Sequence, residues 1–254
     1  MNDVKTDALH QVGELRPDAV PGPVTRSRRR LWGIATLVTL PVLLGMAFFY
    51  APEDANQGAA QRIFYIHVPS AWIGFLAFAI VFVASIAFLA TGKRKWDDMA
   101  SSSAEVGVIF TTAVLITGPL WGRPVWGVYW TWDPRLTTSM LSVLIYVAYV
   151  VLRTFTGDGE AERKFAAALG VLGAANLPII HYSVRKWGGN HPQVITKGGG
   201  GLQHPDMKIA LTLGFVAFTL LAVVLIWQRV RIALASSRLA QAEEEALELG
   251  LGET

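Results

Sequence analysis

Tryptophan is concentrated in one short segment of the chain. The segment 121–137 reads WGRPVWGVYWTWDPRLT and holds four of the nine tryptophans, Trp121, Trp126, Trp130 and Trp132. An aromatic belt at a membrane surface is one interpretation, but a belt places only one or two tryptophans at a helix end. The clustering favours a flat apolar platform for a planar ligand, against which each ring can bury about 150–250 Å².

Two charged side chains follow the tryptophans. Asp133 stands directly before Pro134, an order typical of a helix N-cap followed by proline at the first helical position. This capping role leaves Asp133 free to have a second role at a ligand. Arg135 is the candidate for direct ligand contact, because a guanidinium binds a carboxylate through two parallel hydrogen bonds. Arg62 and Arg123 are possible helpers.

Most of the histidines lie near the ends of apolar segments of the sequence. Four of the five, all except His10, lie at or beside the ends of apolar segments, namely His67, His181, His191 and His204. A single histidine in such a place is usually a polar side chain with an ordinary hydrogen bond. Two histidines beside an aromatic platform favour axial ligation of a metal by neutral imidazoles. The chain has no cysteine, so a haem iron in it would take histidine or methionine, and disulfides, thiolate zinc sites, iron–sulfur clusters and covalent haem are excluded.

The elements that must position these residues are membrane helices. Hydrophobic residues make up 52% of the chain and charged residues 16%, against about 25% charged in soluble domains. All Asp, Glu, Lys and Arg lie outside six stretches, 31–52, 63–92, 106–122, 136–152, 165–184 and 209–228. Each is long enough for a helix to cross the hydrocarbon core, and none alternates as a membrane strand does. The sequence predicts an all-α integral membrane protein with six transmembrane helices.

Basic residues predict the orientation of these helices. Roughly two thirds of the 22 Lys and Arg residues lie on the side that carries both termini. The positive-inside rule therefore places both termini in the cytoplasm. The predicted outer loops, about 53–62, 123–135 and 185–208, then hold the tryptophan segment and most of the histidines on one face.

Three parts make up the predicted organisation. A basic cytoplasmic tail covers 1–30, the membrane domain covers 31–228, and an acidic cytoplasmic tail over 229–254 continues the last helix. The first apolar stretch starts too late and is too long for a cleavable signal, so we interpret it as a permanent anchor. The net charge of +3 gives no reason to expect a nucleic-acid partner. The chain has no Walker A pattern, which argues against ATP use by a phosphate loop. The predicted spans contain no Asp or Glu, which argues against a proton relay.

The residues resemble a known family. The segment Trp121–Thr137 is similar to the tryptophan-rich WWD signature of the haem-handling proteins of cytochrome c maturation, and among these the chain resembles the CcmC family. Tyr65–Pro69, YIHVP, is similar to the first histidine motif of that family, and Asn176–Val184, NLPIIHYSV, to its fifth-helix motif. The resemblance covers about residues 31–228 and implies six spans with a tryptophan-rich periplasmic loop.

The resemblance also implies a set of site residues. The two axial histidines of the family flank the tryptophan segment, which implies His67 and His191 as ligands of a non-covalently bound haem b. The sequence around His191 departs from the commoner pattern of the family, so His204 competes as the second ligand. The implied haem-binding set is His67, His191, Trp121, Trp126, Trp130, Trp132, Asp133, Arg135 and Arg62.

The function that the resemblance implies is not enzymatic. The protein would present haem on the periplasmic face of the bacterial inner membrane and promote its transfer to the haem chaperone CcmE. The ATP-driven CcmA–CcmB pair and the small subunit CcmD are the other implied partners. One alternative is a permease subunit of an ATP-driven haem exporter. A b-type electron-transfer cytochrome is the other, although it requires histidines on facing helices within the bilayer and leaves the tryptophan segment without a role.

Overall fold

The structure is a computed structural model of the 254-residue chain, and it describes residues 23–155, 159–191 and 202–248. Regular structure within these ranges is helical, apart from one isolated bridge between Asp54 and Gly58. A π-helical segment, Met46–Tyr50, extends the first helix, and a 3-10 turn, Ala59–Ile63, leads into the second. The α-helices are α2 (Pro23–Gly45), α3 (Phe64–Thr91), α4 (Arg94–Trp126), α5 (Pro134–Phe155), α6 (Glu160–Ala174), α7 (Asn176–Trp187) and α8 (Pro205–Glu248).

Six helical segments are long and apolar enough to cross a membrane. They are Arg30–Tyr50, Ala59–Thr91, Arg94–Trp126, Pro134–Phe155, Glu160–Trp187 and Pro205–Ser237. The fifth of these consists of α6 and α7, which follow one another with only Ala175 between them. The prediction of an all-α protein with six transmembrane helices is confirmed.

Several helices extend beyond the charge-free stretches, and this corrects the predicted loops. α4 continues through Trp126 and ends at Gly127, which has a φ of 81°. The outer loop expected at 123–135 therefore covers only residues 127–133, and the tryptophan segment is divided between a helix and a loop. α7 likewise continues through Trp187, which shortens the loop expected at 185–208; its residues 192–201 lie outside the described residues. At the other end of the sequence, α8 runs through Glu248 and includes most of the acidic segment.

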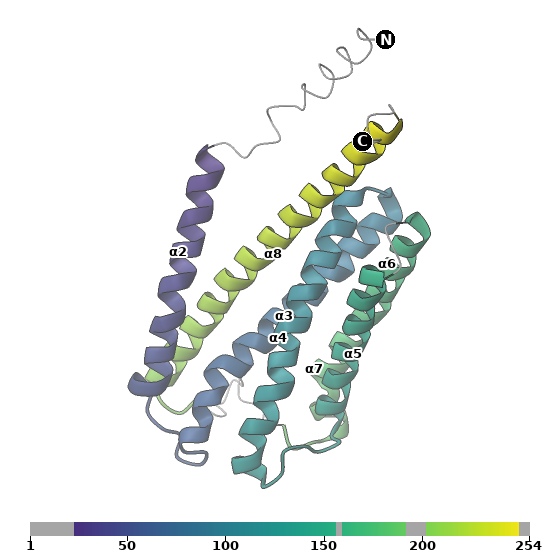
Figure 1. Cartoon of the computed structure of the whole chain (residues 1–254). Coiled ribbons are helices and arrows are strands. Elements are labelled where there is room, and N and C mark those ends of the chain that lie inside the picture. The colour runs from purple at the N-terminus through teal and green to yellow at the C-terminus, as the bar shows by residue number, and fades with distance from the viewer. Residues whose placement is uncertain (1–22, 156–158, 192–201, 249–254) are drawn as a thin grey trace, which may run out of the picture.

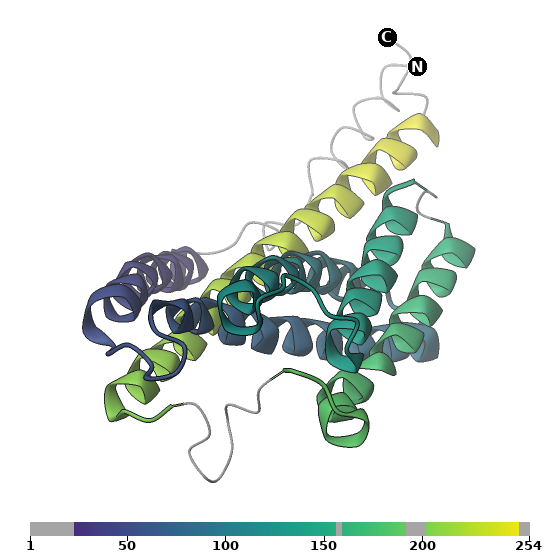
Figure 2. The same cartoon turned by 90° about the horizontal axis from the view of Figure 1, so that it is seen from below.

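The helices are arranged around a central antiparallel pair. α3 and α4 lie against each other, with α5, α6 and α7 on one side and α8 and α2 on the other (Figures 1 and 2). Small residues allow this close approach. A Cβ atom added at Gly74 of α3 would lie 2.4 Å from Cγ2 of Thr111, and one added at Gly107 of α4 would lie 2.5 Å from Cε1 of Phe78.

Apolar side chains are buried in two clusters. One joins α2, α3, α4 and α8, and the other joins α3 to α4, α5 and α6. In the second cluster Phe78 of α3 stacks on Tyr146 of α5, with ring centroids 3.6 Å apart. Many large apolar side chains, such as Phe49 and Leu172, are exposed on the outside of the bundle. An apolar exterior is the expected surface of helices surrounded by lipid.

The two ends of the bundle differ in character. At the end that carries the start of α2 and the end of α8 (Figure 1), the buried Asp97 of α4 accepts a hydrogen bond of 2.7 Å from Arg153 of α5. This ion pair lets α4 begin within a charged segment. The starts of α3, α5 and α8 and the ends of α4 and α7 meet at the opposite end, which we call the site end.

Candidate functional site

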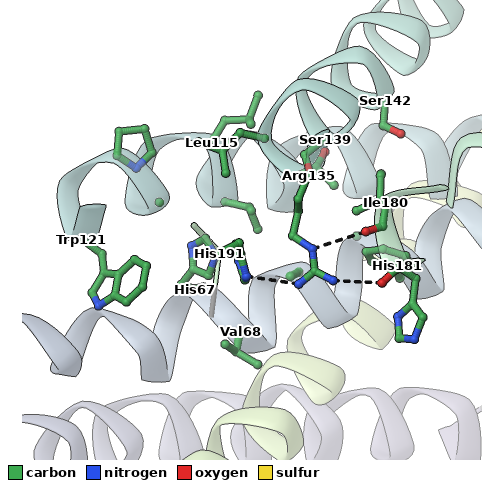
Figure 3. A pocket seen from close by; sticks show the side chains of 18 of the residues that line it. His67, Val68, Leu115, Trp121, Arg135, Ser139, Ser142, Ile180, His181 and His191 are labelled. Carbon is green, nitrogen blue, oxygen red and sulfur yellow. Dashed lines mark hydrogen bonds between the residues drawn. The ribbon is translucent and has the colours of Figure 1, made fainter. Parts of the chain in front are cut away.

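A cavity of 310 Å³ lies at the site end, lined by α3, α4, α5 and α7 (Figure 3). Its volume falls at the lower limit of small-molecule sites, which span about 300–1,000 Å³. Apolar and aromatic side chains make up most of the lining, and the polar groups include three imidazoles and two guanidinium groups, those of His67, His181, His191, Arg135 and Arg185. Six of the nine predicted site residues line it, namely His67, Trp121, Trp126, Trp130, Arg135 and His191.

Two histidines from distant parts of the sequence meet in this cavity. The rings of His67, in the first turn of α3, and His191, just after α7, have centroids 6.4 Å apart and planes inclined by 36°. An imidazole nitrogen binds a transition metal at about 2 Å, and the ring centre lies roughly 1.1 Å behind it, so two rings on opposite sides of one metal have centres about 6.3 Å apart. The observed separation therefore suits a single metal held between the two rings.

The His67 ring is fixed by two neighbouring residues of α4. Its Nδ1 lies 2.8 Å from the hydroxyl oxygen of Thr117. A Cβ atom at Gly118 would lie 3.3 Å from Cε1 of the ring. Any residue other than glycine at this position would therefore displace the ring. Sequence analysis missed both residues, because a threonine and a glycine inside an apolar stretch carry no signal of a site.

Arg135 joins the start of α5 to the middle of α7 and to His191 beyond it. Its Nε and Nη2 donate to the carbonyl oxygens of Ile180 (3.3 Å) and His181 (3.1 Å), and its Nη1 lies 3.2 Å from Nδ1 of His191 (Figure 3). The guanidinium was expected to contact a ligand carboxylate. In this structure it is held by protein acceptors at the wall of the cavity.

Asp133 caps α5 as the sequence predicts. Its Oδ1 accepts a hydrogen bond of 2.9 Å from the backbone N–H of Leu136, three residues on, and Pro134 begins the helix. Asp133 is buried and does not line the cavity. Gly189, with a φ of 140°, packs on it, since a Cβ atom there would lie 3.3 Å from Cβ of Asp133. The N-cap of α5 thus supports the chain that leads to His191.

The tryptophans form two edge-to-face pairs. Trp121 and Trp126 have ring centroids 5.0 Å apart, and Trp130 and Trp132 have centroids 5.7 Å apart. The indole N–H of Trp121 donates to Oε1 of Gln57 at 2.9 Å, which fixes the first pair to the segment before α3. The indole N–H of Trp130 is buried and has no hydrogen-bond partner among the described residues. A cavity wall with an unused donor suits a ligand that brings an acceptor.

Four other candidates lie away from the cavity or at its margin. Trp132 is 73% exposed and is not part of the lining. Arg62 donates to the carbonyl oxygen of Phe48 at 2.6 Å and lies 3.4 Å from Glu53. Arg123 donates to the carbonyl oxygen of Gly127. His204 pairs with Asp206 at the start of α8 and lies outside the cavity, whereas His181 contributes to its lining.

The donor set restricts what the two imidazoles can bind. Among the described residues, no group of three or more His, Asp or Glu side chains could hold a metal ion. A protein site for zinc uses four ligands or three plus water, so two imidazoles alone do not make one. A metal that brings its own planar ring of equatorial ligands needs only two axial donors. The residues present therefore fit a metallated tetrapyrrole, whose flat ring the surrounding tryptophans suit.

Comparison with known proteins places the chain in a family. The model of the family described as "Heme exporter protein C", CcmC, matches residues 18–245. "Heme exporter protein C" of Bradyrhizobium diazoefficiens is 38% identical over 192 residues, which are 75% of this chain and 73% of that protein. "Heme exporter protein C" of Escherichia coli K12 is 34% identical over 201 residues, 78% of this chain and 80% of that protein. A protein of Marchantia polymorpha named "Putative cytochrome c biosynthesis ccmC-like mitochondrial protein" is 34% identical over 174 residues, 68% of this chain and 73% of that protein. The chain is a multi-pass membrane protein that belongs to the heme exporter protein C family.

Proposed function

We propose that this protein binds haem b non-covalently at the site end and presents it there for cytochrome c maturation. One observation carries the proposal. Two imidazoles, with ring centroids 6.4 Å apart, face an aromatic cavity at the ends of membrane helices. The names of the relatives, which refer to haem export and cytochrome c biosynthesis, agree with a haem ligand.

Five of the lining residues have assigned parts in holding the cargo. His67 and His191 are the axial ligands, so the donors that fix an iron come from α3 and from the chain after α7. Trp121, Trp126 and Trp130 supply apolar faces for the macrocycle. The free N–H of Trp130 is placed to donate to an acceptor of the ligand, such as a propionate. Because no bond to the macrocycle is covalent, the cargo can leave again without a bond-breaking enzyme.

Arg135 is the second group for a propionate. It lines the cavity and carries a fixed positive charge that matches a carboxylate in shape and sign. It reaches such a carboxylate by giving up one of its present acceptors. Arg62 is 26% exposed and contacts Phe48 and Glu53. It would have to give up these contacts to reach a propionate in the cavity.

The direction of presentation follows from the charges. The end opposite the site carries the start of α2 and the end of α8, and the predicted topology puts most basic residues of the sequence on that side, so we assign it to the cytoplasm and the site end to the periplasm of a bacterial inner membrane. Trp132, which is exposed and packs on Trp130, links the cavity wall to the surface of this end. We propose that the receiving haem chaperone CcmE docks there. The CcmA–CcmB transporter and CcmD complete the proposed assembly, in which the protein has a delivery role and not an enzymatic one.

A reconstituted transfer assay tests this function. The purified protein is loaded with haem in lipid nanodiscs and mixed with the haem-free soluble domain of the chaperone, and haem is quantified on each protein over time. We expect haem to move to the chaperone and expect the Trp126→Ala variant to lose haem without a partner. A protein that takes up no haem, or transports it only with an ATPase and independently of both histidines, would favour the permease alternative.

A further inference from the structure

His67 and His191, the two proposed ligands, contact partners that differ in whether they donate or accept the hydrogen bond. His67 contacts a threonine hydroxyl through Nδ1, and His191 contacts a guanidinium through Nδ1. A neutral imidazole has one nitrogen that donates and one that accepts, and the partner decides which is which. The identity of each partner therefore reports where each ring carries its proton.

Thr117 assigns the tautomer of His67. The hydroxyl of Thr117 donates its only proton to the carbonyl oxygen of Ala113, at 2.7 Å in the same helix. Its oxygen is then the acceptor in the 2.8 Å contact, and Nδ1 of His67 is the donor. The proton of neutral His67 resides on Nδ1, which leaves the lone pair of Nε2 free to bind a metal.

Arg135 assigns the other tautomer to His191. A guanidinium has donors only, so Nδ1 of His191 must accept in the 3.2 Å contact with Nη1 of Arg135. The proton of neutral His191 then resides on Nε2. This ring has no free nitrogen for a metal while Arg135 holds it, because Nδ1 is occupied and Nε2 is protonated.

We infer that His67 is the resident ligand and that Arg135 is a latch that keeps His191 from ligating until the latch opens. The inference rests on the proposed function, since it concerns the same two imidazoles. If neutral His191 ligated through Nε2, its proton would have to move to Nδ1. The N–H at Nδ1 would then face the N–H of Arg135, which is also a donor. Ligation through Nδ1 needs the place that Arg135 occupies. Both routes require the contact between Arg135 and His191 to break.

The latch gives binding and release an order. Haem attaches first to His67, which is already in the ligating tautomer and is fixed by Thr117 and Gly118. His191 adds second, as Arg135 leaves it and becomes available for a carboxylate of the cargo. On release, the return of Arg135 to His191 competes with the second ligand and weakens the hold on haem at that moment.

Nitrogen NMR of the ligand-free protein tests the tautomers directly. The full-length protein is labelled with ¹⁵N-histidine and reconstituted in nanodiscs, and His67→Gln and His191→Gln variants assign the signals. We expect the protonated nitrogen to be Nδ1 in His67 and Nε2 in His191. Thr117→Val, which keeps the shape and removes the acceptor, should abolish the Nδ1–H preference of His67, and Thr117→Ser should restore it. The same tautomer on both rings would overturn the inference.

Rapid mixing with haem tests the latch. Wild-type protein should show a fast high-spin phase, from His67 alone, and a slower conversion to a low-spin spectrum as His191 adds. The slow phase should be absent in His191→Ala. Because a hydrogen bond from a charged donor is broken in that step, it should accelerate about tenfold or more in Arg135→Met. Arg123→Met is the matched control, since it removes a nearby guanidinium that contacts Gly127 rather than a histidine, and its slow phase should be unchanged.

The outcomes separate this inference from the proposed function. Haem binding in one phase, with the same rate in wild type and Arg135→Met, overturns the latch and leaves the function intact. A wild-type protein that binds no haem overturns both. Arg135→Met also loses two contacts to α7, so its fold is checked by thermal unfolding, and the wild-type NMR result stands whether or not this variant folds.

Discussion

Replacing Gly118 by alanine should weaken haem binding without weakening the fold. A Cβ atom at this position of α4 would lie 3.3 Å from Cε1 of His67. Carbon atoms in contact prefer separations of about 3.5–4.0 Å, so the ring has to move by a few tenths of an ångström. Movement away from α4 also stretches the 2.8 Å contact between the ring and Thr117. The substitution thus acts on the orientation of the proposed ligand.

The magnitude follows from the strain in that side chain. A side chain forced off its preferred rotamer by about 30° loses about 0.5–1.5 kcal/mol, and a shift of a few tenths of an ångström is a smaller rotation, so we expect a haem affinity weaker by about twofold and by no more than about twelvefold. Alanine is at the same time a better helix former than glycine by up to about 1 kcal/mol, so the unfolding temperature should stay equal or rise. The expected result is a loss of affinity that stability does not explain.

Haem titration followed by absorbance, with thermal unfolding of the same samples, provides the assay. Gly33→Ala in α2 is the matched control, because no atom lies within 4 Å of a Cβ atom there, and its haem affinity should equal that of the wild type. An unchanged affinity in Gly118→Ala would refute the view that the His67 ring is held in place by α4. An equal loss in both variants would attribute the effect to helix propensity instead.

Three further predictions concern the platform, the cap and the opposite end of the bundle. Trp126→Ala should weaken haem binding by about 2 kcal/mol or more, while the residual haem keeps its low-spin spectrum. Trp132→Ala should weaken haem binding by no more than about 1.5 kcal/mol, because Trp132 is 73% exposed. The rate of haem loss to a scavenger protein measures both effects. Asp133→Ala should lower the free energy of unfolding by about 1 kcal/mol and Asp133→Asn should not, since asparagine also caps a helix. Equal unfolding temperatures of the two variants in detergent would contradict this. Asp97→Ala removes the buried carboxylate that accepts a hydrogen bond from Arg153 and should destabilise the protein by about 3–5 kcal/mol, and a variant as stable as the wild type would contradict this.

The six membrane helices could be predicted because lipid excludes unpaired charge from an apolar span. The positions of the helix ends could not be predicted in the same way, because a charged residue can lie within a helix where an oppositely charged side chain of another helix pairs with it. α4 begins at Arg94, within a charged segment, since Asp97 meets Arg153 from α5. No local pattern in the sequence reveals that pairing, which depends on how two helices pack.

The end of α4 shows a similar limit. From the sequence, both Gly122 and Gly127 could end the helix, and Pro124 favours the earlier end. The helix ends at Gly127, whose left-handed conformation lets its N–H donate to the carbonyl oxygen of Arg123 at 3.0 Å. Gly122 serves instead to admit the ring of Trp126, to which an added Cβ atom would lie 3.1 Å away.

The site was predictable in its residue types and not in its partners. Aromatic clustering and histidine position identified residues most of which line the cavity, six of the nine predicted. The hydrogen bonds of Arg135 to α7 depend on how that helix returns beside α5, a long-range arrangement that spacing does not encode. The same holds for Thr117, whose role appears only when α3 and α4 lie together.

An absorption spectrum with haem quantification tests the central claim most directly. Wild type and the His67→Ala, His191→Ala and His204→Ala variants are purified in detergent from haem-sufficient cells. We expect low-spin haem in the wild type and in His204→Ala, whose histidine pairs with Asp206 away from the cavity, and loss of that spectrum in the other two. Haem that survives both His67→Ala and His191→Ala with its spectrum intact would contradict the assignment of the two imidazoles as its ligands.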